Sequence, residues 1–82
     1  MYKALVYVTL KPSILDPQGT AVKKGLESLG FSDVMDVRVG KYLEVSLEAE
    51  DKQDAREQVE EMCKKLLSNP VIEDYRFELM EG

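Results

Sequence analysis

The sequence of 82 residues predicts a ferredoxin-like α+β domain, in which a four-stranded antiparallel sheet carries two helices on one face. Apolar residues alternate along four short segments, which is typical of strands, and they recur at helical spacing along two others. These segments follow one another in the order β-α-β-β-α-β, and no linker or low-complexity run divides them. We therefore expect one domain that spans residues 1–82.

The first strand and the first helix have clear boundaries. Residues 3–10 are largely apolar on both alternating sides, which favours a central strand with both edges paired. Asp16 supplies the side-chain acceptor of a helix N-cap, and Pro17 suits the first helical position. Gly30 ends the helix in a left-handed conformation. Gly25 lies near the apolar stripe of this helix, and we expect it to allow a close approach to the sheet.

A hairpin and a second helix follow. Residues 34–39 and 42–49 read as two strands, and Gly40-Lys41 fits a two-residue type II′ turn between them. The second helix is predicted from an N-cap at Asp51 to about Leu67, with acidic residues early and lysines late. After Asn69-Pro70, a last strand is expected over about residues 72–80. The sheet face opposite the helices would be mixed, and such a face often marks a partner surface. Its members would be Leu5, Tyr7, Thr9, Arg38, Glu44, Ser46 and Arg76.

The composition excludes several classes of function. Without histidine and with one cysteine, the chain cannot form a Ser-His-Asp triad, a histidine-based metal site or an internal disulfide. A net charge of −5 opposes binding to nucleic acid. No apolar run approaches the ~20 residues of a membrane span, and the N-terminus lacks the layout of a signal peptide. We therefore expect a cytoplasmic protein that binds neither nucleic acid nor a membrane.

The residues present also provide no catalytic machinery. Neither G-x-x-x-x-G-K-[ST] nor G-x-G-x-x-G occurs, so phosphate-binding loops are absent. Cys63 falls late on the apolar stripe of the second helix, with no histidine to activate it. These features favour a binding or assembly module, with no catalytic, cofactor-binding or metal-binding residue of its own. The alternative is a regulatory domain of the same topology that senses a small ligand.

Several local strings resemble the PurS family, the small subunit of phosphoribosylformylglycinamidine synthase. They are Y-V-T-L-K-P at 7–12, L-D-P-Q-G-T-A-V at 15–22, D-V-R-V-G-K-Y at 36–42, C-K-K-L-L at 63–67 and N-P-V-I-E-D-Y at 69–75. The resemblance covers nearly the whole chain. It implies a subunit of an ATP- and glutamine-dependent enzyme of de novo purine biosynthesis, without catalytic residues of its own.

The resemblance also implies partners. The chain would form a homodimer or higher oligomer, join a glutaminase subunit to a large synthetase subunit and support ammonia transfer between them. ATP and Mg would bind to the synthetase and not to this chain. The residues expected at partner contacts lie in the matching strings: Lys11, Asp16, Gln18, Arg38, Lys41 and Tyr42. Two of them have structural alternatives, because Asp16 can cap a helix and Arg38 can pair with Asp36 or Glu44.

Overall fold

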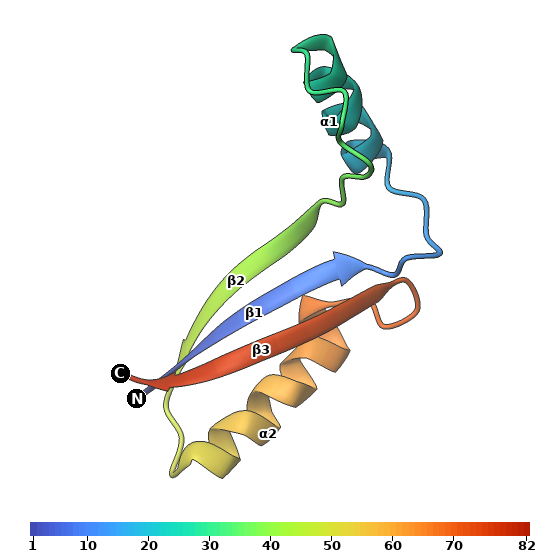
Figure 1. The fold of residues 1–82 in the computed structure, drawn as a ribbon. Helices are drawn as coiled ribbons and strands as arrows, with labels where there is room; N and C mark the ends of the chain where they lie inside the picture. The colour runs from blue at the N-terminus through green and yellow to red at the C-terminus, as the bar shows by residue number, and fades with distance from the viewer.

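The computed structural model describes all 82 residues as a three-stranded sheet, one helix packed on it and a second helix that stands apart (Figure 1). The sheet has the order β2-β1-β3, and both neighbouring pairs are antiparallel. The elements are β1 (Tyr2–Leu10), α1 (Pro17–Ser28), β2 (Gly40–Leu47), α2 (Lys52–Met62) and β3 (Glu73–Glu81), and a π-helical turn (Cys63–Leu67) continues α2.

The core lies between the sheet and α2. Alternate residues of the central strand β1 are fully buried there, as its apolar sequence predicts: Ala4, Val6 and Val8. They pack with Val59 of α2 and with Cys63 of the π-helical turn. No helix lies over the opposite face of the sheet (Figure 1). The prediction of β1 as a central strand is therefore confirmed.

The predicted four-stranded sheet is wrong. Residues 34–39 form no strand, and Gly40 and Lys41 are the first residues of β2, paired with Thr9 and Val8. A Cβ on Gly40 would lie 2.4 Å from the carbonyl oxygen of Val8, so this glycine permits a close approach of two strands and makes no turn. Because the chain runs straight through Gly40 and Lys41 into β2, residues 34–39 do not fold back onto the free edge of β2 and lie beside α1 instead.

The prediction that both helices cover one face of the sheet is wrong for α1. This helix projects beyond the end of the sheet, away from α2 (Figure 1). Gly25, expected to face the sheet, has no atom within 4 Å of the position that a Cβ would take. The radius of gyration is 16.2 Å, whereas a compact chain of this length has about 12 Å. We call residues 11–39 the arm and the rest of the molecule the body.

Local helix signals are confirmed. Asp16 is the N-cap of α1, Pro17 is its first residue, and Gly30 has a φ of 98° after its end. Asp51 caps α2 by accepting from the backbone N–H of Asp54 at 2.8 Å. The predicted second helix keeps its length, but its last turn widens because the N–H and hydroxyl of Ser68 both donate to the carbonyl of Cys63.

The two chain ends lie side by side at the end of the sheet farthest from the arm (Figure 1). The N–H of Gly82 donates to the carbonyl oxygen of Met1 at 2.9 Å. None of the helices has both the length and the apolar character that crossing a membrane requires.

Candidate functional site: the junction of arm and body

Five of the six expected contact residues gather where the arm joins the sheet. We call this region the junction, and its members are Lys11, Asp16, Gln18, Arg38 and Lys41. Lys11 directly follows β1, Asp16 and Gln18 lie at the start of α1, and Lys41 lies at the start of β2. Arg38 lies in residues 34–39, which we call the return segment. A hollow of about 270 Å³ at this point is lined by Asp16, Gln18 and Lys41, together with Glu73 of β3. The matching strings, although distant in sequence, therefore meet in space.

The Asp16 side chain connects the start of α1 to the end of the return segment. Its side chain accepts from the N–H of Gly19 at 3.0 Å and from the N–H of Val39 at 2.8 Å. The residue is only 4% exposed. The bond from Val39, followed by that from Gly19, lowers the pKa of the Asp16 carboxyl, because both bonds stabilise its charged form. The predicted capping role is thus confirmed, and the same carboxylate also positions the return segment.

Arg38, which is exposed, connects the return segment to the residues between β1 and α1. Its guanidinium donates to the carbonyl oxygens of Lys11 and Ile14, each at 2.9 Å. The alternative ion pairs with Asp36 or Glu44 are not formed. The guanidinium bonds these two carbonyls instead, and the carboxylate of Glu44 lies 2.9 Å from the Nζ of Lys3. We call the bonds of Asp16 and Arg38 together the latch.

The two lysines of the junction keep their charged ends near solvent. The Nζ of Lys11 lies 3.5 Å from a carboxylate oxygen of Asp74. The Nζ of Lys41 lies 3.9 Å from Glu73 and donates to the carbonyl oxygen of Leu67 at 3.4 Å. Ion pairs this long, with the lysine end exposed, contribute little to stability. Both ammonium groups can therefore exchange their present contacts for those of a partner, and Gln18 beside them is exposed as well.

Tyr42 lies on the sheet face that α2 leaves open. Its ring centroid is 5.2 Å from that of Tyr7, and the guanidinium of Arg76 lies 4.1 Å from the centroid of Tyr7. The hydroxyl of Tyr42 donates to Glu44 at 2.9 Å, and this bond is the main cause that raises the pKa of the tyrosine. This face combines aromatic and charged groups, as the mixed pattern of the strands predicts.

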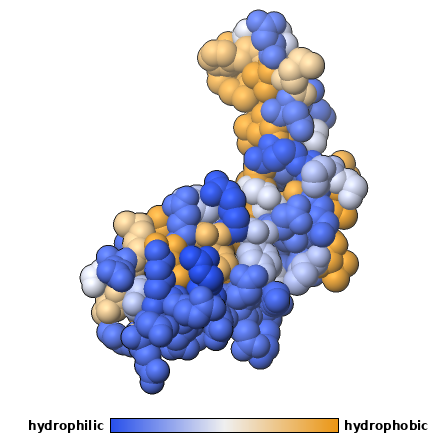
Figure 2. Space-filling model, turned by 60° about the horizontal axis from the view of Figure 1, so that its bottom comes forward, coloured by the Kyte–Doolittle hydropathy of each residue, from blue (hydrophilic) through white to orange (hydrophobic).

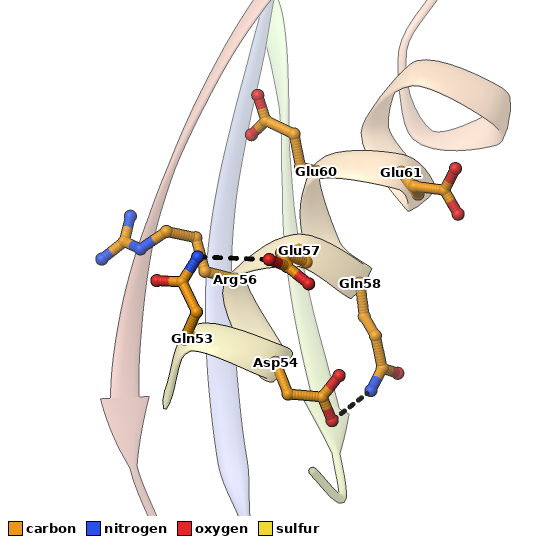
Figure 3. A pocket seen from close by; sticks show the side chains of 7 residues that line it. All are labelled: Gln53, Asp54, Arg56, Glu57, Gln58, Glu60 and Glu61. Atoms are coloured by element: carbon orange, nitrogen blue, oxygen red, sulfur yellow. Dashed lines mark hydrogen bonds between the residues drawn. The ribbon is translucent and has the colours of Figure 1, made fainter. Parts of the chain in front are cut away.

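The largest hollow, of about 660 Å³, offers no chemical site. It follows the outer surface of α2 and is lined by polar residues of that helix alone: Gln53, Asp54, Arg56, Glu57, Gln58, Glu60 and Glu61 (Figure 3). Two of its hydrogen bonds run along the helix, from Gln53 to Glu57 and from Gln58 to Asp54. No group of three or more acidic or cysteine side chains is placed to hold a metal ion.

Burial raises the pKa of the Cys63 thiol, which disfavours the nucleophilic thiolate.

Sequence reasoning did not identify the apolar surface of the arm. Leu15, Phe31 and Met35 are 79%, 58% and 87% exposed. They lie outside the helical stripe, so periodicity gave no signal for them. Hydrophobic residues gather along one side of the arm (Figure 2).

The comparisons with known proteins agree with one another. The family model PurS, described as phosphoribosylformylglycinamidine (FGAM) synthase, matches residues 3–81. The phosphoribosylformylglycinamidine synthase subunit PurS of Bacillus subtilis is 56% identical over 81 residues, which cover 99% of this chain and 95% of that protein.

Solved structures show the same similarity. A crystal structure of B. subtilis PurS superimposes with a TM-score of 0.88 at 54% identity, covering 99% of this chain and 100% of the other. A chain in the structure of PurLQS from Thermotoga maritima gives a TM-score of 0.87 at 32% identity, covering 96% of both chains.

Proposed function

Because this chain belongs to the PurS family, we propose that it is the subunit that joins a glutaminase to a large synthetase within FGAM synthase. The observation that carries the proposal is the match to PurS over nearly the whole chain. The small-ligand sensor is not favoured, because that similarity leaves no part of the chain for a different kind of domain.

The physical role of such a subunit is to hold two active sites in a fixed relation. Ammonia released by a glutaminase into water is protonated near neutral pH and diluted. A fixed separation of the two sites raises the effective concentration of ammonia at the second one. In this proposal ATP and Mg²⁺ bind to the synthetase, the assembly works in the cytoplasm, and two or more copies of this chain associate.

The junction residues are the proposed partner contacts. Lys11, Arg38 and Lys41 bring three cationic side chains to the place where the arm joins the sheet, together with the exposed side chain of Gln18. Tyr42 extends the contact onto the open sheet face. Asp16 is too buried to make a large contact with a partner subunit. We assign it the role of positioning Gly19 and Val39 through its two hydrogen bonds.

Reconstitution tests the assembly role. The chain is purified with candidate glutaminase and synthetase subunits, and the mass of the complex is measured with and without glutamine and ADP. We expect glutamine-dependent FGAM formation to need all three proteins, whereas formation driven by added ammonia needs the synthetase but not the glutaminase. Turnover of substrate by this chain alone would refute the proposal.

A charge reversal tests the contact surface. Lys41→Glu is compared with Lys52→Glu, which makes the same change at the exposed start of α2. We expect at least a tenfold weaker association with the partner subunits for Lys41→Glu and no change for Lys52→Glu. Equal association of the two variants would remove Lys41 from the contact.

A further inference from the structure

Two neighbouring residues of the expected contact set point to opposite sides of the sheet. Lys41 and Tyr42 are consecutive in β2, and successive side chains of a strand alternate between its two faces. The ammonium of Lys41 lies on the side where α2 packs, near the carbonyl oxygen of Leu67 and the carboxylate of Glu73. The ring of Tyr42 lies on the open face, beside that of Tyr7. A flat partner surface placed against either face therefore reaches only one of the two side chains.

The open face carries aromatic and cationic groups in a row across its middle. In the strand register, Tyr7 of β1 lies opposite Tyr42 of β2 and Arg76 of β3. The centroids of the two rings are 5.2 Å apart, and the guanidinium of Arg76 lies 4.1 Å from the centroid of Tyr7. We call these three residues the tyrosine row. Tyrosine and arginine are among the residue types that dominate binding at protein interfaces.

The tyrosine row is held in place before any partner binds. The hydroxyl of Tyr42 donates to Glu44 at 2.9 Å, and Arg76 stacks on the ring of Tyr7. Side chains that are already fixed lose less conformational entropy on binding. Tyr42 is nevertheless 52% exposed and the side chain of Arg76 is 71% exposed, and no helix covers this face (Figure 1). The row is thus a preformed contact surface.

Charge distinguishes the open face from the junction. On the open face, the Nζ of Lys3 lies 2.9 Å from the carboxylate of Glu44. The guanidinium of Arg76 lies 4.0 Å from that of Glu78. At the junction, Arg38 bonds two neutral carbonyl oxygens as part of the latch, and these bonds leave its charge uncompensated. The open face therefore suits a partner surface that is largely uncharged, whereas the junction suits an acidic one.

We propose that the open sheet face, through the tyrosine row, binds one of the two partner subunits, and that the junction binds the other. A subunit that joins two proteins needs two contact surfaces, and the tyrosine row and Lys41 lie on opposite faces of the sheet. The occupant of the open face is the partner subunit whose contact surface is apolar and nearly neutral. The inference rests on the proposed function, and it assigns Tyr42 to a contact separate from that of Lys41.

Measuring each partner subunit alone tests this division. The chain and its variants are titrated against the immobilised glutaminase and, separately, against the synthetase, with glutamine and ADP present. We expect Tyr42→Ala and Arg76→Ala to weaken association with one partner at least tenfold and to leave the other within about twofold. Lys41→Glu should show the reverse pattern. Arg56→Ala removes the same charge from the outer surface of α2 and is the matched control, expected to change neither association.

The salt dependence gives a second readout. Raising the salt from about 0.05 M to about 0.5 M should weaken the association that Lys41→Glu removes. The same increase should leave the association that depends on the tyrosine row nearly unchanged. Circular dichroism checks that Tyr42→Ala and Arg76→Ala fold, which we expect because both side chains are exposed and their truncation leaves no cavity in the core.

Three results would overturn the division of contacts. Loss of the same partner in Tyr42→Ala and Lys41→Glu would show one continuous contact. Unchanged association of Tyr42→Ala and Arg76→Ala with both partners would show that the tyrosine row binds neither. A lower mass of these two variants on their own, with both partners still bound, would assign the open face to a second copy of the chain. A wild type that binds neither partner would instead refute the proposed function itself.

Discussion

Asp16 shows how one side chain can set the direction of a larger segment. As a helix cap it needs only one acceptor oxygen, which binds the N–H of Gly19. The second oxygen binds Val39, which is far along the chain. The helix cap could be predicted from Asp16-Pro17, because capping depends on residues that are neighbours in the sequence. The hydrogen bond to Val39 could not be predicted, because it depends on the path by which the chain returns from α1 to the sheet.

The Asp16 carboxyl should make the arm sensitive to acid. The pKa of this carboxyl is lower in the folded chain than in the unfolded chain. Its contribution to the stability of the fold is therefore complete above the unfolded pKa of about 3.9, and it is lost as the pH falls through the folded pKa. We expect the amide NMR signals of Val39 and Gly19 to shift together in a transition below about pH 3.9. Asp16→Asn should loosen the arm near neutral pH and abolish this transition. A shared midpoint at or above the ordinary aspartate value would contradict the assignment.

At the scale of elements, five of the six predicted segments formed, and the predicted strand over residues 34–39 did not. β1, α1, α2 and β3 agree with their predicted ranges within a few residues. Residues 34–39 alternate like a strand, yet the outer edge of β2 stays unpaired, because Gly40 and Lys41 lie within β2 and make no turn that would fold this segment back onto that edge. A sequence pattern reports which residues can pair but not whether the chain turns between them. The six contact residues were chosen from the matching strings, and five of them meet at the junction; their contacts with partners stay a prediction.

Gly19 tests how closely the return segment packs on α1. A Cβ at Gly19 would lie 2.1 Å from the carbonyl oxygen of Val37. We expect Gly19→Ala to destabilise the chain by about 1–3 kcal/mol, because the return segment must move away. Glu27→Ala on the same helix is the control and should change stability by less than about 0.5 kcal/mol. Urea unfolding followed by circular dichroism measures both. Equal midpoints for the two variants would show that the segment is free to shift.

At the scale of the whole molecule, the body and the arm differ in what stabilises them. The body contains all six residues of the buried apolar core, whereas the only buried residues of the arm are Asp16 and Gly19. An 82-residue chain that divides itself in this way gives up much of the burial that a single compact domain would achieve.

The self-association proposed for this chain predicts that its thermal stability depends on its concentration. Association stabilises the folded state by mass action. For a dimer that unfolds to single chains, a tenfold increase in concentration should raise the Tm by roughly 3–5 °C. Differential scanning calorimetry over a hundredfold range of concentration measures this. Leu29→Asp places a charge on an exposed apolar residue of the arm, and we expect it to weaken the dependence. A constant Tm for the wild type would mean that the arm is stable without a second chain.

The adjacency of the two chain ends has a practical consequence. Tyr2 pairs with Glu81 across the sheet, and Gly82 bonds to Met1. A short peptide could therefore connect the native termini, and new ends could be opened in an exposed loop. Fluorescent or affinity fusions placed at either native end would likewise lie at the end of the sheet farthest from Lys41 and Arg38, away from the proposed partner contacts.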